Sequence, residues 1–517
     1  MLELDCPTAA AAWLKSRVTG TLRADSRQIM AGDGFLAWPG AAVDARQHVI
    51  SALKSGAAAC LVEIGNAEPY NFEDDAIAGY RNLKTATGPI ASAYFDNPSA
   101  HIDVIAVTGT NGKTSTAWWL AHALSTLKLV EPISCGFIGT LGIGVMRKNA
   151  ETGNLTLETS SNGLTTPDPM LLQRGLREFQ KEGIRACALE ASSIGIEEHR
   201  LDGMRIRVAV FTNFTQDHLD YHGNMQAYWE SKARLFQWPG LQAAVLNIDD
   251  EKGSELFAQL TASSAKRVDV WTVSCERVAR LQALDISHEK RGLSFTVVEN
   301  ELRLPLKTQL TGRFNASNLL GVIAAMRVLG VPLNACVAAC EALTPVPGRM
   351  ESQGGTGFDP LVIVDYAHTP DALSKTLTAL RSVALQRGGR LWCVLGCGGN
   401  RDASKRPLMG SIASQLSDRL IVTSDNPRSE SPQAIADHIR AGIVDAKQVD
   451  VQLDRSLAIR HALNLADSRD IVLVAGKGHE DYQEIAGVKR PFSDQLQVQL
   501  ALMARVPAFG ALQGIRE

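Results

Sequence analysis

The stretch DVIAVTGTNGKTSTAWWLAHAL, residues 103–124, decides the fold because its character changes twice. An apolar run ends at Thr108, a glycine-containing loop follows, and a helix-forming segment begins near Lys113. A strand, a glycine loop and a helix in this order favour phosphate, because backbone N–H groups and the helix dipole face the loop. Lys113 is placed to reach terminal phosphates and the Thr114 hydroxyl to ligate Mg²⁺. The stretch therefore predicts a nucleotide-binding α/β domain.

The loop TGTNGKTS, residues 108–115, is a variant of the general phosphate-binding pattern. Val107 stands where that pattern has its first glycine. An ordinary tight turn is the alternative interpretation, and the flanking strand and helix make it the minor one. The loop residues that we expect to contact ATP are Gly109, Thr110, Asn111, Gly112, Lys113, Thr114 and Ser115.

Composition limits the classes to which the chain can belong. Of its 517 residues, 45% are hydrophobic and 21% are charged, and the formal net charge is −3. These values predict two to four globular domains and argue against nucleic acid or a membrane surface as a partner. The nine cysteines lack zinc-finger spacing, and the first residues lack a signal or membrane-spanning pattern. We therefore expect a cytoplasmic protein without a membrane span, and we expect it to be a monomer.

Apolar runs recur along the chain, and each ends in a polar or glycine-containing loop. The central runs include RACALE and VDVWTVS, and after LTPVPGRMES the pattern restarts with PLVIVD, RLWCVLG, RLIVTSD and DIVLVAG. Such runs, separated by helical stretches, predict buried and largely parallel sheets, with ligands outside the carboxyl ends of the strands. We predict an α/β protein of three domains: a small N-terminal domain at 1–102, a central P-loop ATPase-like domain at 103–346 and a C-terminal Rossmann-like doubly wound domain at 347–517.

Several polar residues near predicted strand ends could have either a purely structural role or a functional one. Glu190 and His218 could hold a cation, although each alone is more often a cap or turn residue. Lys232, in YWESKARLF, taken alone indicates an exposed helix lysine. Asn315 stands at a predicted helix start, where capping competes with purine contact.

Two further candidates belong to the predicted third domain or its border. Arg349, in PGRME, is either a surface salt-bridge residue or a phosphate clamp that closes with the domains. Asp365, in VDYAHTPD, either caps a helix or lines the nucleotide cleft.

Ten motifs together resemble one family across essentially the whole chain. They are TGTNGKT, EASS, DHLDYHG, YWESK, GRFNASN, PGRME, VDYAHTPD, GCGGNRD, DNPR and GKGHED. The chain resembles the Mur ligase family, and most closely those members that add a diamino acid to a UDP-N-acetylmuramoyl dipeptide. The resemblance implies an ATP-dependent amide ligase of peptidoglycan precursor synthesis. Its substrates would be UDP-N-acetylmuramoyl-L-Ala-D-Glu, meso-2,6-diaminopimelate and ATP, with Mg²⁺ as cofactor and an acyl phosphate as intermediate.

Four other functions stay open at this point. The same ligase could use L-lysine, or the chain could be a folylpolyglutamate synthetase-like ligase, which would lack the first domain and DNPR. A nucleotide-regulated binding protein and a kinase that stops at the phosphorylated product are the remaining two.

The resemblance also implies roles for individual residues. Lys113, His218 and Lys232 would be catalytic, with Lys232 carrying a carbamate. The implied Mg²⁺ ligands are Thr114, Glu190 and His218, and the further ATP-binding residues are Asn315, Arg349 and Asp365. The UDP-muramoyl dipeptide would meet Ser26, the loop from Gly40 to Asp44, Thr165, Thr166, Ser192, Glu198 and Arg200. The diaminopimelate site would comprise Arg401, Asp425, Asn426, Pro427, Arg428, Gly476 and Glu480.

Two of these positions carry the specificity argument. Glu198 stands where many relatives have glutamine, and a carboxylate beside an anionic substrate repels it unless it is paired. Arg428 ends the DNPR stretch, and a guanidinium can grip the second carboxylate that distinguishes diaminopimelate from lysine. The resemblance therefore favours diaminopimelate.

Overall fold

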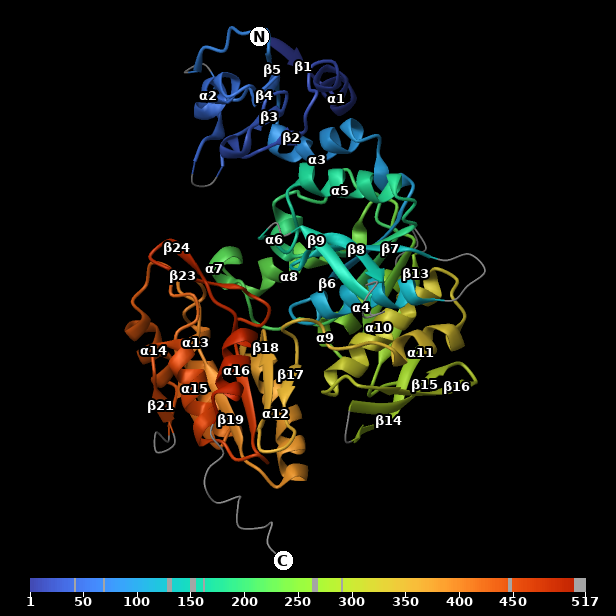
Figure 1. Cartoon of the computed structure of the whole chain (residues 1–517). Helices are drawn as coiled ribbons and strands as arrows, with labels where there is room; N and C mark the ends of the chain where they lie inside the picture. Colours follow the sequence, from blue (N-terminus) through green and yellow to red (C-terminus); the bar gives the residue numbers. More distant parts are fainter. Residues whose placement is uncertain are drawn as a thin grey trace, which may run out of the picture. The chain divides into compact units, whose positions relative to one another are not determined.

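The computed structural model describes residues 1–40, 43–67, 70–127, 133–148, 155–160, 163–262, 268–289, 292–444 and 449–505. Figure 1 shows the helices and strands, coloured along the chain from the N-terminus to the C-terminus. The chain divides into two compact units. The first comprises Met1–Asn213, Trp229–Leu281 and Leu319–Ala339, and the second comprises Phe214–Tyr228, Gln282–Asn318 and Cys340–Glu517. The division passes through helices α8 (Met225–Ala233), α10 (Phe314–Val328) and α11 (Leu333–Glu341).

The start of the first unit is a parallel sheet in the order β1-β5-β4-β3-β2. Alternate residues of its strands enter different cores: Leu61 packs on one face, while Cys60 and Val62 pack on the other. Burial on both faces explains why the strands are apolar throughout. The elements are β1 (Leu2–Leu4), α1 (Pro7–Lys15), β2 (Leu22–Arg23), β3 (Gly34–Ala37), α2 (Val49–Lys54), β4 (Ala59–Glu63), β5 (Ile77–Tyr80) and α3 (Leu83–Tyr94).

The remainder of the first unit is built on a larger sheet, in which the strands from β13 onward run in the order β13-β12-β11-β6-β10-β7-β8-β9. Neighbours from β13 to β7 are parallel, and β7, β8 and β9 pair antiparallel. The strands are β6 (Asp103–Thr108), β7 (Cys135–Gly139), β8 (Gly142–Lys148), β9 (Leu155–Ser160), β10 (Ala186–Glu190), β11 (Val208–Phe211), β12 (Ala243–Asn247) and β13 (Asp269–Ser274). The helices include α4 (Lys113–Thr126), α5 (Pro169–Lys181), α6 (Ser193–Glu197) and α9 (Glu251–Ala262).

The second unit contains a sheet in the order β17-β18-β22-β19-β20-β21, in which only the β17–β18 pair is antiparallel. Its strands are β17 (Glu351–Gly354), β18 (Leu361–Asp365), β19 (Leu391–Leu395), β20 (Arg419–Val422), β21 (Val449–Val451) and β22 (Ile471–Ala475). Cys393 packs in one core and Trp392 in the other, so the sheet is buried on both faces. The helices are α12 (Pro370–Arg387), α13 (Lys405–Leu416), α14 (Pro432–Arg440), α15 (Arg455–Leu465) and α16 (Asp494–Met503).

Further elements complete the second unit. They are α7 (Leu219–His222), β14 (Leu281–Glu289), the antiparallel pair β15 (Gly292–Glu299) and β16 (Leu302–Thr308), and the hairpin β23 (Tyr482–Ile485) and β24 (Val488–Pro491). Among the helices of the described ranges, none has the length and apolar character needed to cross a membrane.

The predicted α/β class and the largely parallel sheets are confirmed. Strands β18, β22, β19 and β20 are mutually parallel, so the loops that follow them meet at one sheet edge, as expected from the sequence. The boundaries at residues 102 and 346 stay predictions.

Candidate active site

The phosphate loop between β6 and α4 is held by the end of β11. The backbone N–H of Thr110 donates to the carbonyl oxygen of Asn213 at 2.8 Å. The N–H of Asn111 donates to the Asn213 side-chain oxygen at 2.9 Å. Gly109 has φ +146, and a Cβ there would lie 1.9 Å from Oγ1 of Thr212. Glycine is therefore required at this point of the loop, both by conformation and by space.

Two lysines converge on the carbonyl oxygen of Gly109. Lys113, the first residue of α4, donates from Nζ to this oxygen and to that of Thr110, both at 2.9 Å. Lys232 donates from Nζ to the same Gly109 oxygen at 2.8 Å, and its side chain is only 1% exposed. The interpretation of Lys232 as an exposed helix lysine is thus wrong, because α8 turns this side chain inward toward the loop.

A carboxylate and a hydroxyl lie beside the loop at the end of β10. Thr114 Oγ1 donates to Glu190 Oε2 at 2.8 Å, and Glu190 is fully buried. The backbone N–H of Thr140 donates to the other carboxylate oxygen, also at 2.8 Å. Oxygen atoms of this kind suit Mg²⁺, which takes few protein ligands and completes its shell with water and phosphate. In the described ranges, no three His, Cys, Asp or Glu side chains lie close enough together to form a metal site. The case that these residues could hold Mg²⁺ therefore rests on Thr114 and Glu190.

Four of the residues expected to hold the muramoyl peptide form one network around the start of α6. Thr166 Oγ1 donates to the carbonyl oxygen of Glu190 at 2.8 Å and lies 2.9 Å from Ser192 Oγ. Arg200 Nη1 donates to the carbonyl oxygen of Thr166 at 2.9 Å. Thr165 joins through Thr140, hydroxyl to hydroxyl, at 3.1 Å. The network ties these side chains to the same strand end that carries the Glu190 carboxylate.

Glu198, the unusual carboxylate, is paired. Its Oε2 lies 2.7 Å from Nζ of Lys84, near the start of α3. Glu198 is the C-cap residue of α6, so the ion pair joins the helix that follows the small sheet to the helix that follows β10. The repulsion that an unpaired carboxylate would exert on an anionic substrate is therefore reduced.

The residues expected to meet the nucleotide of the muramoyl substrate lie in loops of the small sheet. Ser26 begins the short helix η1 (Ser26–Gln28), and none of its described contacts joins the Thr166 network. Of the loop from Gly40 to Asp44, residues 41 and 42 lie outside the described residues. Asp44 accepts hydrogen bonds from Arg46 and from the Tyr70 hydroxyl, and these lower the pKa of Asp44 to about 2 against some burial.

In the second unit, Asp217 is a buried carboxylate surrounded by cationic groups. It is 4% exposed and lies 3.4 Å from Lys405 Nζ, 3.4 Å from His218 Nε2 and 3.6 Å from His368 Nε2. Burial alone would raise the pKa of Asp217, but the hydrogen bond and charge of His368, with the charges of His218 and Lys405, hold it well below the usual range. His218, an expected metal ligand, is therefore next to an ionised carboxylate.

Asp365 closes β18 and organises the turn that carries Arg349. Its Oδ2 accepts the backbone N–H of Met350 at 2.7 Å, and burial raises the pKa of Asp365 despite the nearby charge of Arg349. The Arg349 guanidinium lies over the Tyr366 ring, 4.3 Å from its centroid. Asn315 lies in the first turn of α10, where its amide donates to the Thr311 carbonyl oxygen at 2.7 Å.

The DNPR loop after β20 is linked to the loop after β22. A Cβ on Gly476 would lie 2.6 Å from Oδ2 of Asp425, so the two strand ends are in close contact. Asn426 donates from Nδ2 to Glu480 at 2.7 Å, and Lys477 Nζ donates to Asn426 Oδ1 at 3.0 Å. The backbone N–H of Asn426 also donates to Asp425 Oδ1 at 2.6 Å, so Asp425, Asn426 and Glu480 share one hydrogen-bond network with Lys477.

Arg428 faces a carbonyl and a carboxylate. Its Nη1 donates to the Gly399 carbonyl oxygen at 2.8 Å, and its Nε lies 3.6 Å from Glu484 Oε2. Its backbone has φ +52, a left-handed conformation, and pairs with β23 in a bridge to Ile485. Arg401 follows the loop that contains Gly399 and is exposed. Hairpin β23–β24 thereby fixes where the DNPR arginine points.

Sequence reasoning missed three residues of these clusters. Lys477 is fully buried and Lys405 is 7% exposed, although lysine is usually at the surface. Burial first, and then the charges of Arg349, Lys477 and His368, lower the pKa of His479 to about 3. Lys477 and His479 lie in the GKGHED motif, next to the expected site residues Gly476 and Glu480. This position in the motif is the sequence feature that could have identified them.

The geometry defines a class of protein: α/β enzymes with a phosphate loop on one sheet and a second, doubly wound sheet. Two family models match the chain, the Mur ligase middle domain at residues 107–326 and the Mur ligase, glutamate ligase domain at residues 348–478. The chain belongs to the Mur ligase family.

Three similar proteins support this assignment. A UDP-N-acetylmuramoyl-L-alanyl-D-glutamate--2,6-diaminopimelate ligase from Acidovorax sp. (strain JS42) is 56% identical over 496 residues, which cover 95% of this chain and 96% of that protein. A solved structure of a ligase with the same name is 34% identical, covers 94% of each chain and has a TM-score of 0.62. The MurF ligase from Thermotoga maritima in complex with ADP has a TM-score of 0.63 and covers 94% of this chain and 97% of its own. At 18% identity that last likeness concerns the fold alone.

Proposed function

We propose that this enzyme is an ATP-dependent ligase that joins meso-2,6-diaminopimelate to the D-Glu side-chain carboxylate of UDP-N-acetylmuramoyl-L-Ala-D-Glu. The observation that carries the proposal is the convergence of Lys113 and Lys232 on the phosphate loop, beside the buried Thr114–Glu190 pair. The similarity to the Acidovorax ligase extends over 95% of the chain, which includes the small first sheet. That extent disfavours a folylpolyglutamate synthetase-like ligase, which would lack the first domain.

The first step is transfer of the γ-phosphoryl group of ATP to the D-Glu carboxylate. The bond between phosphorus and the β,γ-bridging oxygen breaks, a carboxylate oxygen takes its place on phosphorus, and ADP leaves. Such transfers depend mainly on positioning and charge neutralisation. Lys113 supplies positive charge at the loop, and the Gly109–Thr114 backbone orients the phosphates. Mg²⁺, held by Thr114 and Glu190, would add charge neutralisation when bound.

The second step is attack of the diaminopimelate amine on the acyl phosphate. A C–N bond forms, a tetrahedral centre collapses, phosphate leaves and the amine loses a proton. The network of Asp425, Asn426, Glu480 and Lys477 offers acceptors for the ammonium group of the amino acid and a cation for its carboxylate. Arg428 would bind the second carboxylate, which lysine lacks.

Lys232 would act as a carbamate. The ammonium group first loses a proton; the neutral amine then attacks CO₂, an N–C bond forms and a second proton is released, so a cation becomes an anion. Burial favours the neutral amine that this reaction needs. The resulting carboxylate would lie at the Gly109 carbonyl, where it could orient a cation bound at the loop.

The proposal is tested by following phosphate release from the purified chain with ATP and Mg²⁺. We expect release only when both the UDP-muramoyl dipeptide and meso-diaminopimelate are present. Release that ignores both substrates would indicate a nucleotide-regulated binding protein, and a stable phosphorylated product would indicate a kinase.

A further inference from the structure

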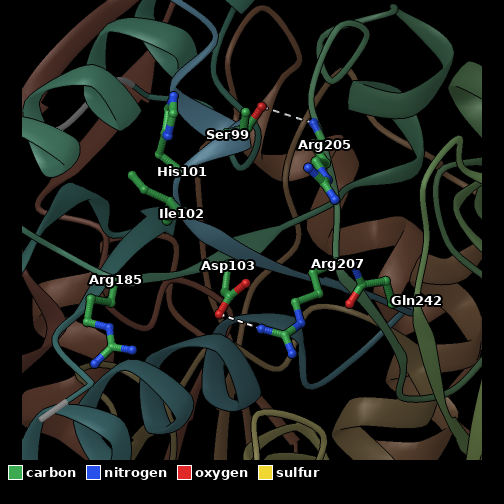
Figure 2. A pocket seen from close by; sticks show the side chains of 9 residues that line it. Ser99, His101, Ile102, Asp103, Arg185, Arg205, Arg207 and Gln242 are labelled. Atoms are coloured by element: carbon green, nitrogen blue, oxygen red, sulfur yellow. Dashed lines mark hydrogen bonds and ion pairs between the residues drawn. The ribbon is translucent and has the colours of Figure 1, made fainter. Parts of the chain in front are cut away.

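The edge of the large sheet remote from the phosphate loop carries a polar cavity. Strands β10, β6, β11 and β12 are neighbours and parallel, so their amino ends meet at this edge while the phosphate loop follows the carboxyl end of β6. The cavity measures about 290 Å³ and is shown in Figure 2. Its polar lining includes His101, Asp103, Arg185, Arg205, Arg207 and Gln242.

Backbone hydrogen bonds between neighbouring strands hold the main chain of the lining residues. The N–H of Asp103 donates to the carbonyl oxygen of Arg185 at 2.9 Å, and the N–H of Gln242 donates to that of Arg207 at 3.0 Å. The N–H of Arg205 donates to Ser99 Oγ at 3.0 Å. The backbone of residues at four adjacent strand starts is therefore fixed around one cavity, and the lining side chains extend from these fixed points.

The charge of the cavity is opposite to that of the whole protein. Three guanidinium groups and one carboxylate line it, whereas the chain as a whole carries a formal charge of −3. The carboxylate of Asp103 is engaged by Arg207 at 2.6 Å. Within the described residues, the Arg205 guanidinium makes no ion pair, and the buried Nε of Arg207 has no hydrogen-bond partner. Like charges collected in this way repel one another unless an anion lies between them.

We propose that this cavity is a binding site for a small phosphate dianion. Guanidinium groups present planar pairs of N–H donors that match phosphate oxygens, which an ammonium group does not. The volume lies at the lower end of the range for small-molecule sites, so it admits a small anion such as inorganic phosphate together with water. The site is separate from the phosphate loop and does not depend on the ligase function.

The test is a calorimetric titration of the full chain with sodium phosphate at pH 8, with sodium chloride holding the ionic strength constant. We expect one site, and we expect Arg185→Gln with Arg205→Gln to weaken the binding by about tenfold or more, because hydrogen bonds to charged groups contribute at least this factor. Arg440→Gln, an exposed arginine on α14, is the matched control and should bind as the wild type does.

Two further variants keep the result decisive. Lys113→Ala should bind phosphate as the wild type does, since that lysine belongs to the other sheet edge. If the Lys113→Ala variant no longer bound phosphate, the ion would be bound at the loop between β6 and α4, and the proposal would be overturned. Arg205→Gln alone removes a side chain without an ion pair among the described residues, so it serves if the double variant does not fold. Unchanged affinity in this variant, or no binding to the wild type, would also overturn it.

Discussion

The Nε atom of Arg428 lies 3.6 Å from the Oε2 atom of Glu484, and both side chains are more than three-quarters buried. The DNPR arginine therefore has a carboxylate partner of its own before any amino acid arrives. A substrate carboxylate at this point would compete with Glu484 for the guanidinium. This relationship makes the specificity of the proposed amino-acid site open to test.

Arg428→Ala should raise the KM for meso-diaminopimelate by about 10², because a charged hydrogen bond in a desolvated site contributes a few kcal/mol. The value of kcat should change much less, since the arginine is remote from the reacting amine in this account. Steady-state kinetics measure both constants. Arg440→Ala is the matched control, and an unchanged KM in Arg428→Ala would refute the specificity argument.

Glu484→Gln should lower the KM for meso-diaminopimelate a few-fold, because the competing carboxylate becomes neutral. The backbone of Glu484 accepts the N–H of Arg428 at 3.0 Å and keeps the loop in place in the variant. The same kinetic assay applies. A KM raised as far as in Arg428→Ala would show instead that Glu484 holds the arginine in its working position.

Lys84→Ala should raise the KM for the UDP-muramoyl dipeptide a few-fold, because it removes the cation 2.7 Å from Glu198. The effect should be small, since both side chains are partly exposed and such pairs contribute up to about 1 kcal/mol. Adding Glu198→Gln to Lys84→Ala should restore the KM. A double variant as impaired as Lys84→Ala would mean that Lys84 acts on the substrate without Glu198.

Lys232→Ala should lose nearly all ligase activity, and short carboxylates such as formate or acetate should restore part of it. The small anion would replace the carbamate in the buried space beside Gly109. The measurement is activity against carboxylate concentration, with Lys113→Ala as the control that carboxylates should not rescue. Equal rescue of both variants, or of neither, would argue against the carbamate.

His479 should stay neutral well below pH 6, because burial first, and then nearby positive charge, lowers its pKa to about 3 from 6.5. The unfolded chain binds a proton at this imidazole between these pH values and the folded chain does not. The contribution of His479 to the free energy of unfolding therefore decreases as pH falls from 6.5 toward 3, by at most about 1.4 kcal/mol per pH unit. Nitrogen-15 NMR shifts, assigned with His479→Gln, report the protonation; a midpoint near 6.5 would contradict the burial argument.

The strands and the glycine loop between strand and helix could be predicted from the sequence because both depend on local patterns. Apolar runs predict strands, and glycine with lysine between strand and helix predicts the loop that the structure confirms around Gly109. Strand ends also placed Asp365 and Asp425 on one sheet edge.

Contacts between segments far apart in the chain could not be predicted from the sequence. Lys232 is buried because α8 packs with that face inward, and a charged residue in a short helix gives no sign of this. The Arg428–Glu484 pair depends on the bridge between the DNPR loop and β23, and the Lys84–Glu198 pair depends on two helices of different sheets. Such pairings follow from tertiary packing and not from local periodicity.

The central claim is that this chain joins meso-diaminopimelate, and not L-lysine, to the muramoyl dipeptide. The most direct measurement is mass spectrometry of the product formed when ATP, Mg²⁺, UDP-muramoyl dipeptide and equal concentrations of the two amino acids are supplied together. We expect the diaminopimelate amide to exceed the lysine amide by about 10² or more. A predominant lysine amide, or phosphate release without either amide, would contradict the account.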